Sequence, residues 1–365
     1  MPKIARGPNA GNSPTSDGGP FRGRSRRWRN LAGSGDPRTW IEPFVFGRGL
    51  SFIRQLCSLL ARAQTRRALW QYWVADIAMG LATYAVHYPL RLLPLDACSA
   101  IGGGLGLLVG WFRRSHVPQL RARASFARLH PRRAGKRDLD AAMKRMSANI
   151  GRVYAEYNIL DLLWSAGRIT VTGQEHLAAC RDGNRPIIVF GVHLTSWEVI
   201  GATLLGLGYD VYTLYRPAGN RFQDRIVVAV RMRGGAKLIP PGPRGARQAY
   251  RVLVDRCGLF LTWVDERTDG NARVPAFGRQ IRRDGNLAAM IRLANLTGAQ
   301  AIPAYVERQR GARFHTTFGA PVRFLQGGDE STAHLANLRN LDALISSIIL
   351  PRLEDWWMLP GLRFD

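Results

Sequence analysis

Short apolar runs rich in β-branched residues alternate with helix-spaced segments over the last two thirds of the chain. A buried parallel strand shows a continuous apolar run, whereas a helix packed on a sheet repeats apolar positions every three or four residues. Strands are predicted over residues 169–172, 186–190, 210–214, 237–239, 259–264 and 300–307, and helices over residues 139–164, 199–207, 221–233, 244–256 and 286–297. This alternation predicts an α/β domain with a layered, mostly parallel sheet flanked by helices, and residues 312–318 add an antiparallel edge strand.

Two apolar segments with little charge precede the alternating region. From residue 68 to residue 90 the only formal charge is Asp76, and the second segment, residues 97–112, ends at two arginines. About 20 apolar residues cross the hydrocarbon core of a bilayer. An N-terminal membrane-anchoring helical segment is therefore predicted, either as one inserted helix or as a hairpin that enters and returns. A buried helix pair in a soluble protein is the alternative. The basic excess over residues 113–137 favours the cytoplasmic side for that region.

Composition divides the chain into three parts. The first 45 residues are rich in Gly, Pro, Ser and Arg and lack apolar periodicity, which predicts a disordered basic tail over residues 1–45. The membrane-anchoring segment is assigned to residues 46–120, and the α/β domain to residues 121–365. The four cysteines lie far apart without a CxxC pair, so the sequence suggests neither a zinc site nor a disulfide framework.

Charge points to an anionic partner. The chain has 52 Lys and Arg residues against 26 Asp and Glu residues, a formal net charge of +26. Such a field attracts nucleic acid, anionic lipid or an acidic protein. A nucleic-acid partner is not expected, because no nucleic-acid-binding motif is present and the basic residues are not interleaved with aromatic ones. A basic nucleic-acid-binding protein nevertheless remains the alternative from a different functional class.

The strongest chemical signal follows the predicted strand over residues 186–190. Gly191 permits a tight exit from the strand, His193 lies in the loop, and Glu198 falls in the first turn of the next helix. A carboxylate that accepts one ring N–H of a histidine fixes its tautomer and raises the basicity of the other nitrogen. We therefore expect His193 and Glu198 to remove a proton from a substrate hydroxyl. A capping or core histidine is the structural alternative.

Residues 191–198, with the sequence GVHLTSWE, resemble the HX4D/E box of glycerolipid acyltransferases in its Glu form. The Glu form behind a membrane-anchoring segment is similar to the late acyltransferases of lipid A biosynthesis, the lauroyl and myristoyl transferases. Further segments resemble motifs of that family in the same order: Leu214 to Pro217, Arg231 to Gly235, Trp263 to Gly270, Val274 to Gly278 and Ile302 to Arg308. The sequence departs from the family at residues 265–267, where Asp-Glu-Arg replaces Asp-Gln-Asp.

This resemblance implies a glycerolipid-acyltransferase-like fold on the cytoplasmic face of an inner membrane. It implies transfer of a fatty acyl chain from acyl carrier protein to a hydroxyl of a lipid A precursor, and it implies neither a metal nor an organic cofactor. Acyl carrier protein is acidic and suits a basic surface. A lysophospholipid or another glycolipid, such as an acylated inositol mannoside, is the alternative acceptor, and an inactive membrane scaffold is a further alternative.

Four more charged residues are candidates for substrate binding. Arg216 follows a predicted strand, Arg231 and Arg233 end a predicted helix, and Asp265 follows the strand over residues 259–264. Guanidinium groups suit bidentate phosphate binding, and the resemblance implies that Arg231 or Arg233 binds the acceptor or stabilises an oxyanion. Asp265 can orient a sugar hydroxyl or an arginine. The alternatives are a solvated helix end for the arginines and a turn-capping role for Asp265.

Overall fold

A computed structural model describes residues 67, 69–256, 258–325 and 330–364. The tail predicted over residues 1–45 lies outside the described residues. The chain divides into two compact units, Met1–Met79 and Gly80–Asp365. The first unit contains the π-helical turn η1 (Gln71–Ala75). The helix α5 (Asp76–Leu90) follows it directly.

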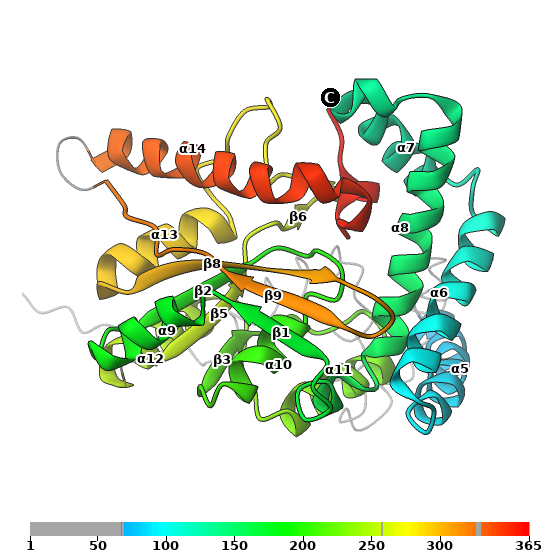
Figure 1. Ribbon diagram of the computed structural model, residues 1–365, viewed down its shortest axis with the longest axis horizontal. Helices are drawn as coiled ribbons and strands as arrows, with labels where there is room; N and C mark the ends of the chain where they lie inside the picture. The colour runs from blue at the N-terminus through cyan, green and yellow to red at the C-terminus, as the bar shows by residue number, and fades with distance from the viewer. Residues whose placement is uncertain (1–66, 68, 257, 326–329, 365) are drawn as a thin grey trace, which may run out of the picture. The chain divides into compact units, whose positions relative to one another are not determined.

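A seven-stranded sheet is the centre of the second unit, with the order β1-β9-β8-β2-β5-β3-β4 (Figure 1). The strands are β1 (Ile169–Thr172), β2 (Ile187–Gly191), β3 (Val211–Leu214), β4 (Lys237–Ile239), β5 (Leu259–Trp263), β8 (Gln300–Arg308) and β9 (Phe314–Phe318). The five strands from β8 to β4 are mutually parallel, which confirms the predicted sheet type. A separate two-stranded hairpin consists of β6 (Arg267–Thr268) and β7 (Asn271–Ala272).

The strand predicted over residues 312–318 is antiparallel, but its predicted place at the edge is wrong. β9 runs antiparallel to β8 and pairs on its other side with β1, which forms the edge. Side chains alternate between half-buried and exposed along β1, as suits an edge strand with one face packed. The hydrophobic pattern of a strand reports its burial but not the identity of its neighbour, so sequence reasoning could not separate these two positions.

Helices cover both faces of the sheet, as its continuous apolar strands require. Ile188 and Phe190 of β2 face one core, while Ile187 and Val189 face the other. The first core includes residues of α12 (Pro243–Arg256), α13 (Asn286–Thr297) and α14 (Glu330–Ile349), and the second includes residues of α9 (Gln174–Asp182), α10 (Val199–Gly206) and α11 (Arg221–Arg233). Figure 1 shows α13 and α14 on one side of the sheet, and α10 and α11 on the other.

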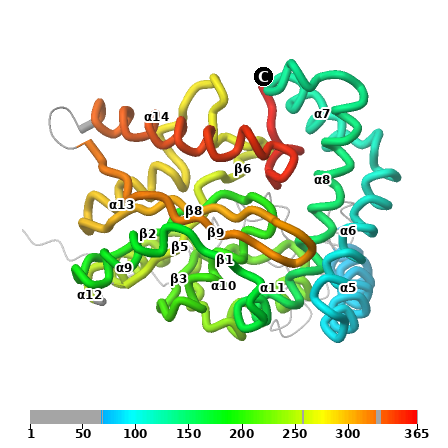
Figure 2. The backbone as a smooth tube through the Cα atoms, viewed as in Figure 1, coloured from blue at the N-terminus to red at the C-terminus, as the bar shows by residue number. Residues whose placement is uncertain are grey.

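Further helical segments lie between α5 and the sheet. They are α6 (Leu95–Phe112), α7 (Val117–Leu129), the short turn η2 (Pro131–Arg133) and α8 (Lys136–Glu156). α6 and α8 lie side by side (Figure 2). A Cβ atom on Gly102 would lie 2.5 Å from the Cβ atom of Ala155, so only glycine permits this approach. Among the described residues, α6 is the one helix that is long and apolar enough to cross a membrane, by length and composition alone.

The helix predicted over residues 139–164 ends earlier than expected. α8 stops at Glu156, and the 3-10 turn η3 (Leu160–Leu162) leads into β1. After α14 the chain forms two more 3-10 turns, η4 (Leu350–Asp355) and η5 (Leu359–Gly361). Between these turns Trp356 forms an isolated antiparallel bridge with Leu194, so the C-terminal segment returns to the loop that follows β2.

Candidate active site

His193 and Asp265 leave the sheet side by side. β2 and β5 are parallel neighbours, and their register pairs Gly191 with Trp263. His193 and Asp265 each follow the last paired residue by two positions, at the carboxyl ends where sites form in α/β sheets. Nδ1 of His193 lies 2.8 Å from Oδ1 of Asp265, and the backbone N–H of His193 donates to Oδ2 at 2.8 Å. With Nδ1 as the donor to this carboxylate, Nε2 is the nitrogen that can accept a proton.

Asp265 is held by a third donor from the far end of the chain. Its side chain is fully buried, and the indole Nε1 of Trp356 donates to Oδ2 at 2.7 Å. Three donors on one carboxylate offset the cost of removing its charge from water. They also leave the carboxylate a single orientation toward His193.

Glu198 does not occupy the position that the sequence predicted for it. The carboxylate at Nδ1 of His193 is Asp265, and the carboxylate of Glu198 accepts two bonds from Arg231 instead. Nη2 lies 2.5 Å from Oε1, and Nε lies 3.2 Å from Oε2. The hydroxyl of Tyr157 also hydrogen-bonds to this pair. Asp265 takes the place at Nδ1 because the neighbouring strand brings it there, whereas Glu198 begins α10 beside α11.

The guanidinium of Arg231 is held in its charged form. Burial works to lower the pKa of Arg231, but the charge of Glu198 and its hydrogen bonds outweigh burial and raise that pKa above its usual value. Burial, followed by the charge of Glu198, also raises the pKa of the Tyr157 hydroxyl. Both side chains of the ion pair are 13% exposed. The arginine therefore stays cationic and the tyrosine stays a donor at any pH at which the protein works.

A buried ion pair fixes the loop between His193 and Glu198. Glu156 of α8 is 2% exposed, and Nη2 of Arg308 at the end of β8 donates to its Oε2 at 2.7 Å. The hydroxyl of Ser196 donates to Glu156, and Nη2 of Arg308 lies 3.2 Å from Ser196 Oγ. Thr195 has a φ of 49°, a left-handed conformation that costs a non-glycine residue about 1–3 kcal/mol and persists only where surrounding contacts impose it.

Aromatic rings surround the imidazole. The ring centroid of His193 lies 5.0 Å from that of Trp197 and 5.1 Å from that of Trp263. Trp357 lies beyond Trp197, at a centroid distance of 5.0 Å. Nε2 of His193 makes no hydrogen bond to the part of the chain that the structure describes. The proton-accepting nitrogen is thus set among apolar walls, where electrostatic interactions are stronger than in water.

An apolar cavity of about 250 Å³ opens beside Glu198 and Arg231. It lies between α10, α11 and the strands β3 and β5. Small and aliphatic residues form much of its wall: Gly201, Ala202, Leu205, Val230 and Leu261. Trp263 lines the cavity and also contacts the ring of His193, so the cavity and His193 share a wall.

The other two predicted binding residues lie apart from this group. Arg216 is exposed in the loop after β3. Arg233 is also exposed, and its Nη1 lies 3.9 Å from the carboxylate of Asp161, which accepts two bonds of 2.8 Å from Arg91. The structure therefore brings together His193, Asp265, Glu198 and Arg231, whereas Arg233 lies beside Asp161, a carboxylate that Arg91 also binds.

Sequence reasoning missed four residues of this centre: Tyr157, Glu156, Arg308 and Trp356. Glu156 carried a usable signal, because it is a charged residue within a helix whose neighbours are apolar. Arg308 directly follows a predicted buried strand and ends the segment from Ile302 to Arg308 that resembles a family motif, which was also a usable signal. Trp356 gave no comparable signal, since 91 residues separate it from Asp265.

Comparison with known proteins places the chain in a family. The family model described as bacterial lipid A biosynthesis acyltransferase matches residues 62–362. No curated protein matches the chain. One solved structure that matches is the crystal structure of the 1-acyl-sn-glycerophosphate (LPA) acyltransferase PlsC from Thermotoga maritima, at 13% identity and a TM-score of 0.33, over 68% of this chain and 97% of that one. The family match, in contrast, extends from the helices before the sheet to the C-terminal turns, and so the chain belongs to the bacterial lipid A biosynthesis acyltransferases and is an acyltransferase.

Proposed function

We propose that this protein transfers a fatty acyl chain from acyl carrier protein to a hydroxyl of a lipid A precursor, with His193 as the general base. One observation carries the mechanism. Nδ1 of His193 lies 2.8 Å from the buried carboxylate of Asp265 at the carboxyl ends of two adjacent parallel strands. This geometry supports a tautomer with the proton on Nδ1, in which Nε2 can accept a proton from the substrate.

In the proposed reaction, Nε2 of His193 takes the proton of the acceptor hydroxyl as its oxygen attacks the carbonyl carbon of the acyl thioester. A carbon–oxygen bond forms, and the carbonyl oxygen becomes an oxyanion. The carbon–sulfur bond then breaks, and the thiolate leaves with the proton that His193 carried. Asp265 stabilises the imidazolium that exists between these two steps. No side-chain nucleophile is required.

Arg231 is the candidate for stabilising negative charge, with Glu198 as the residue that orients it. The guanidinium is fixed by Glu198 and Tyr157 beside the wall that the cavity shares with His193. A preorganised cation in a poorly hydrated site stabilises an oxyanion or an acceptor phosphate more than the same charge would in water. Glu198 thus remains part of the proposed machinery, in a different role from that predicted.

The apolar cavity fits the hydrocarbon part of the acyl donor. Much of its wall is built from small and aliphatic side chains, which suit a hydrocarbon chain. Burial of hydrocarbon yields about 0.8 kcal/mol for each methylene. An acyl chain bound there would lie next to Trp263, which also contacts His193.

We further propose that α6 attaches the protein to the cytoplasmic face of the inner membrane. Its inner face packs on α8 through Gly102 and Gly106, whereas apolar side chains on its outer face are exposed: Ile101, Leu105, Leu108, Trp111 and Phe112. A helix with one face packed on a folded domain suits the interface plane of a bilayer better than a full crossing. Arg113 and Arg114 at its end suit anionic headgroups.

An assay with defined substrates tests the proposed function. Purified protein is mixed with acyl carrier proteins that carry chains of different lengths and with a lipid A precursor, a lysophospholipid or an acylated inositol mannoside, and products are identified by mass. We expect a mass gain of one acyl chain on the lipid A precursor alone, and none with His193→Ala. Transfer to the lysophospholipid instead would overturn the acceptor, and transfer by His193→Ala would overturn the mechanism.

A further inference from the structure

Trp356 lies where the C-terminal segment meets the catalytic loop. Its side chain is fully buried and makes an edge contact with Phe277 at a centroid distance of 5.8 Å. Its indole N–H donates to Oδ2 of Asp265 at 2.7 Å, the same oxygen that accepts the backbone N–H of His193. One carboxylate thus connects the indole, the backbone and the imidazole.

The main chain of the C-terminal segment is tied to the same loop. The backbone N–H of Trp357 donates to the carbonyl of His193 at 2.9 Å, and the backbone N–H of Thr195 donates to the carbonyl of Asp355 at 3.0 Å. These two bonds flank the bridge between Leu194 and Trp356. The loop that carries His193 therefore has a short antiparallel partner from the far end of the sequence.

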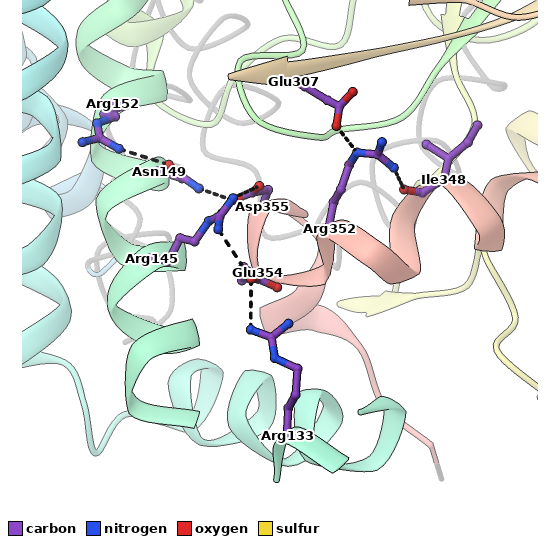
Figure 3. Close-up of polar contacts among 9 residues, drawn as sticks. All are labelled: Arg133, Arg145, Asn149, Arg152, Glu307, Ile348, Arg352, Glu354 and Asp355. Atoms are coloured by element: carbon purple, nitrogen blue, oxygen red, sulfur yellow. Dashed lines mark hydrogen bonds and ion pairs between the residues drawn. The ribbon is translucent and has the colours of Figure 1, made fainter. Parts of the chain in front are cut away.

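Ion pairs anchor this partner to α8 and to the turn before it (Figure 3). Arg145 donates to both carboxylate oxygens of Asp355, at 3.2 and 3.0 Å, and Asn149 donates to the same carboxylate. Nη2 of Arg133 lies 3.3 Å from the carboxylate of Glu354. Contacts of Glu354 and Asp355 on one side of Trp356, and the backbone bond of Trp357 on the other, thus hold the indole beside Asp265.

We propose that Trp356 is a positioning residue for acyl transfer: its indole N–H holds Asp265 against Nδ1 of His193, and the C-terminal segment is thereby a working part of the active site. The inference rests on the proposed role of His193 as general base. A purely structural tryptophan would need only its ring volume, whereas a positioning tryptophan needs its N–H group.

Removal of the indole N–H group should change the pH dependence of kcat/KM. Without it, the negative charge of Asp265 is less stabilised and holds the imidazolium form of His193 more strongly. Because a hydrogen bond to a charged group stabilises that charge, its loss should move the acid limb of the pH profile of kcat/KM to higher pH, by about one pH unit. Arg267, whose charge interacts with that of Asp265, is unchanged by a substitution at Trp356.

The test replaces Trp356 by Phe and, in a second variant, by 3-benzothienylalanine introduced at that site alone, which keeps the ring shape and lacks the N–H group. kcat/KM is measured from pH 5 to pH 9 in the assay described above, together with thermal unfolding. For both variants we expect the acid limb to move up by about one unit and the rate at neutral pH to fall about 10-fold. Trp357→Phe, a matched change in the next residue, should leave the acid limb in place.

An unchanged acid limb in the benzothienyl variant would overturn the proposal, even if the Phe variant were less active or less stable. A limb that moves equally in Trp357→Phe would overturn it as well, because the effect would then belong to the segment and not to the N–H group. Failure of the proposed function is a separate result, since it would appear as acyl transfer by His193→Ala.

Discussion

The two ends of the run from His193 to Glu198 are only five residues apart, yet they lie in opposite electrostatic settings. At His193 a fully buried carboxylate, Asp265, faces a ring that can gain or lose a proton. At Glu198 a carboxylate faces Arg231, whose pKa is raised, so that the arginine keeps its positive charge. In the proposed reaction the imidazole of His193 changes its protonation state, whereas Arg231 beside Glu198 stays cationic. A single sequence motif therefore contains two functions.

The largest effects are expected from substitutions of His193 and Asp265. We expect His193→Ala and Asp265→Asn each to lower kcat by about 10²–10⁴-fold, because the first removes the base and the second removes the charge that stabilises the imidazolium. The rate is measured per folded molecule, with thermal unfolding and membrane retention as controls. If Asp265→Asn kept a rate within a few-fold of the original protein, the role of orienting carboxylate would have to be given to another residue.

At the second end we expect stability to suffer more than the rate. Glu198→Gln leaves Arg231 buried beside a neutral amide, and breaking a buried pair costs about 3–5 kcal/mol of unfolding free energy. Glu198→Asp should lose less than Glu198→Gln, since the charge remains. The double variant Glu198→Gln/Arg231→Met should regain stability but not the rate. If Glu198→Gln had normal stability but lowered kcat as much as His193→Ala, then Glu198 and His193 would act in the same proton-transfer step.

The cavity beside Glu198 gives a third, smaller test. A Cβ atom on Gly201 would lie 3.7 Å from Leu261, so a leucine side chain there can enter the cavity without a backbone clash. We expect Gly201→Leu to shift the preference toward shorter acyl donors by about 10-fold per two methylenes excluded. Gly104→Leu is the matched control, because nothing lies within 4 Å of its Cβ position. Chain preferences that stay the same would move the acyl site elsewhere.

The smallest effect is expected at Arg145, which binds Asp355 of the C-terminal segment. The side chain of Arg145 is 61% exposed, and exposed ion pairs contribute about 0–1 kcal/mol. We expect Arg145→Gln to lower the unfolding free energy by less than about 1 kcal/mol, because Asn149 still holds Asp355. Arg308→Gln, at the buried pair with Glu156, should cost about 3–5 kcal/mol in the same denaturation experiment. Equal costs would mean that burial does not govern these pairs.

The strands and helices of the domain could be predicted because each depends on local pattern. β2 and β5 are continuous apolar runs, and the helices between strands repeat their apolar positions at helical spacing. The same reasoning located His193 and Asp265 at carboxyl ends of strands. It could not pair them, because the strand order of the sheet depends on the packing of the whole domain and not on the pattern of any one strand.

The sequence by itself therefore determined the α/β class, the loop that carries His193 and the family resemblance, all of which rest on residues close together in the chain. Tertiary structure alone decided which carboxylate serves the histidine. Glu198 is nearer in sequence, but Asp265 is nearer in space, since β2 and β5 are in register and Trp356 fixes the carboxylate from 91 residues away. A hydrogen bond requires two groups at about 2.8 Å, and that distance follows from the positions of strands in the fold and not from their separation along the chain.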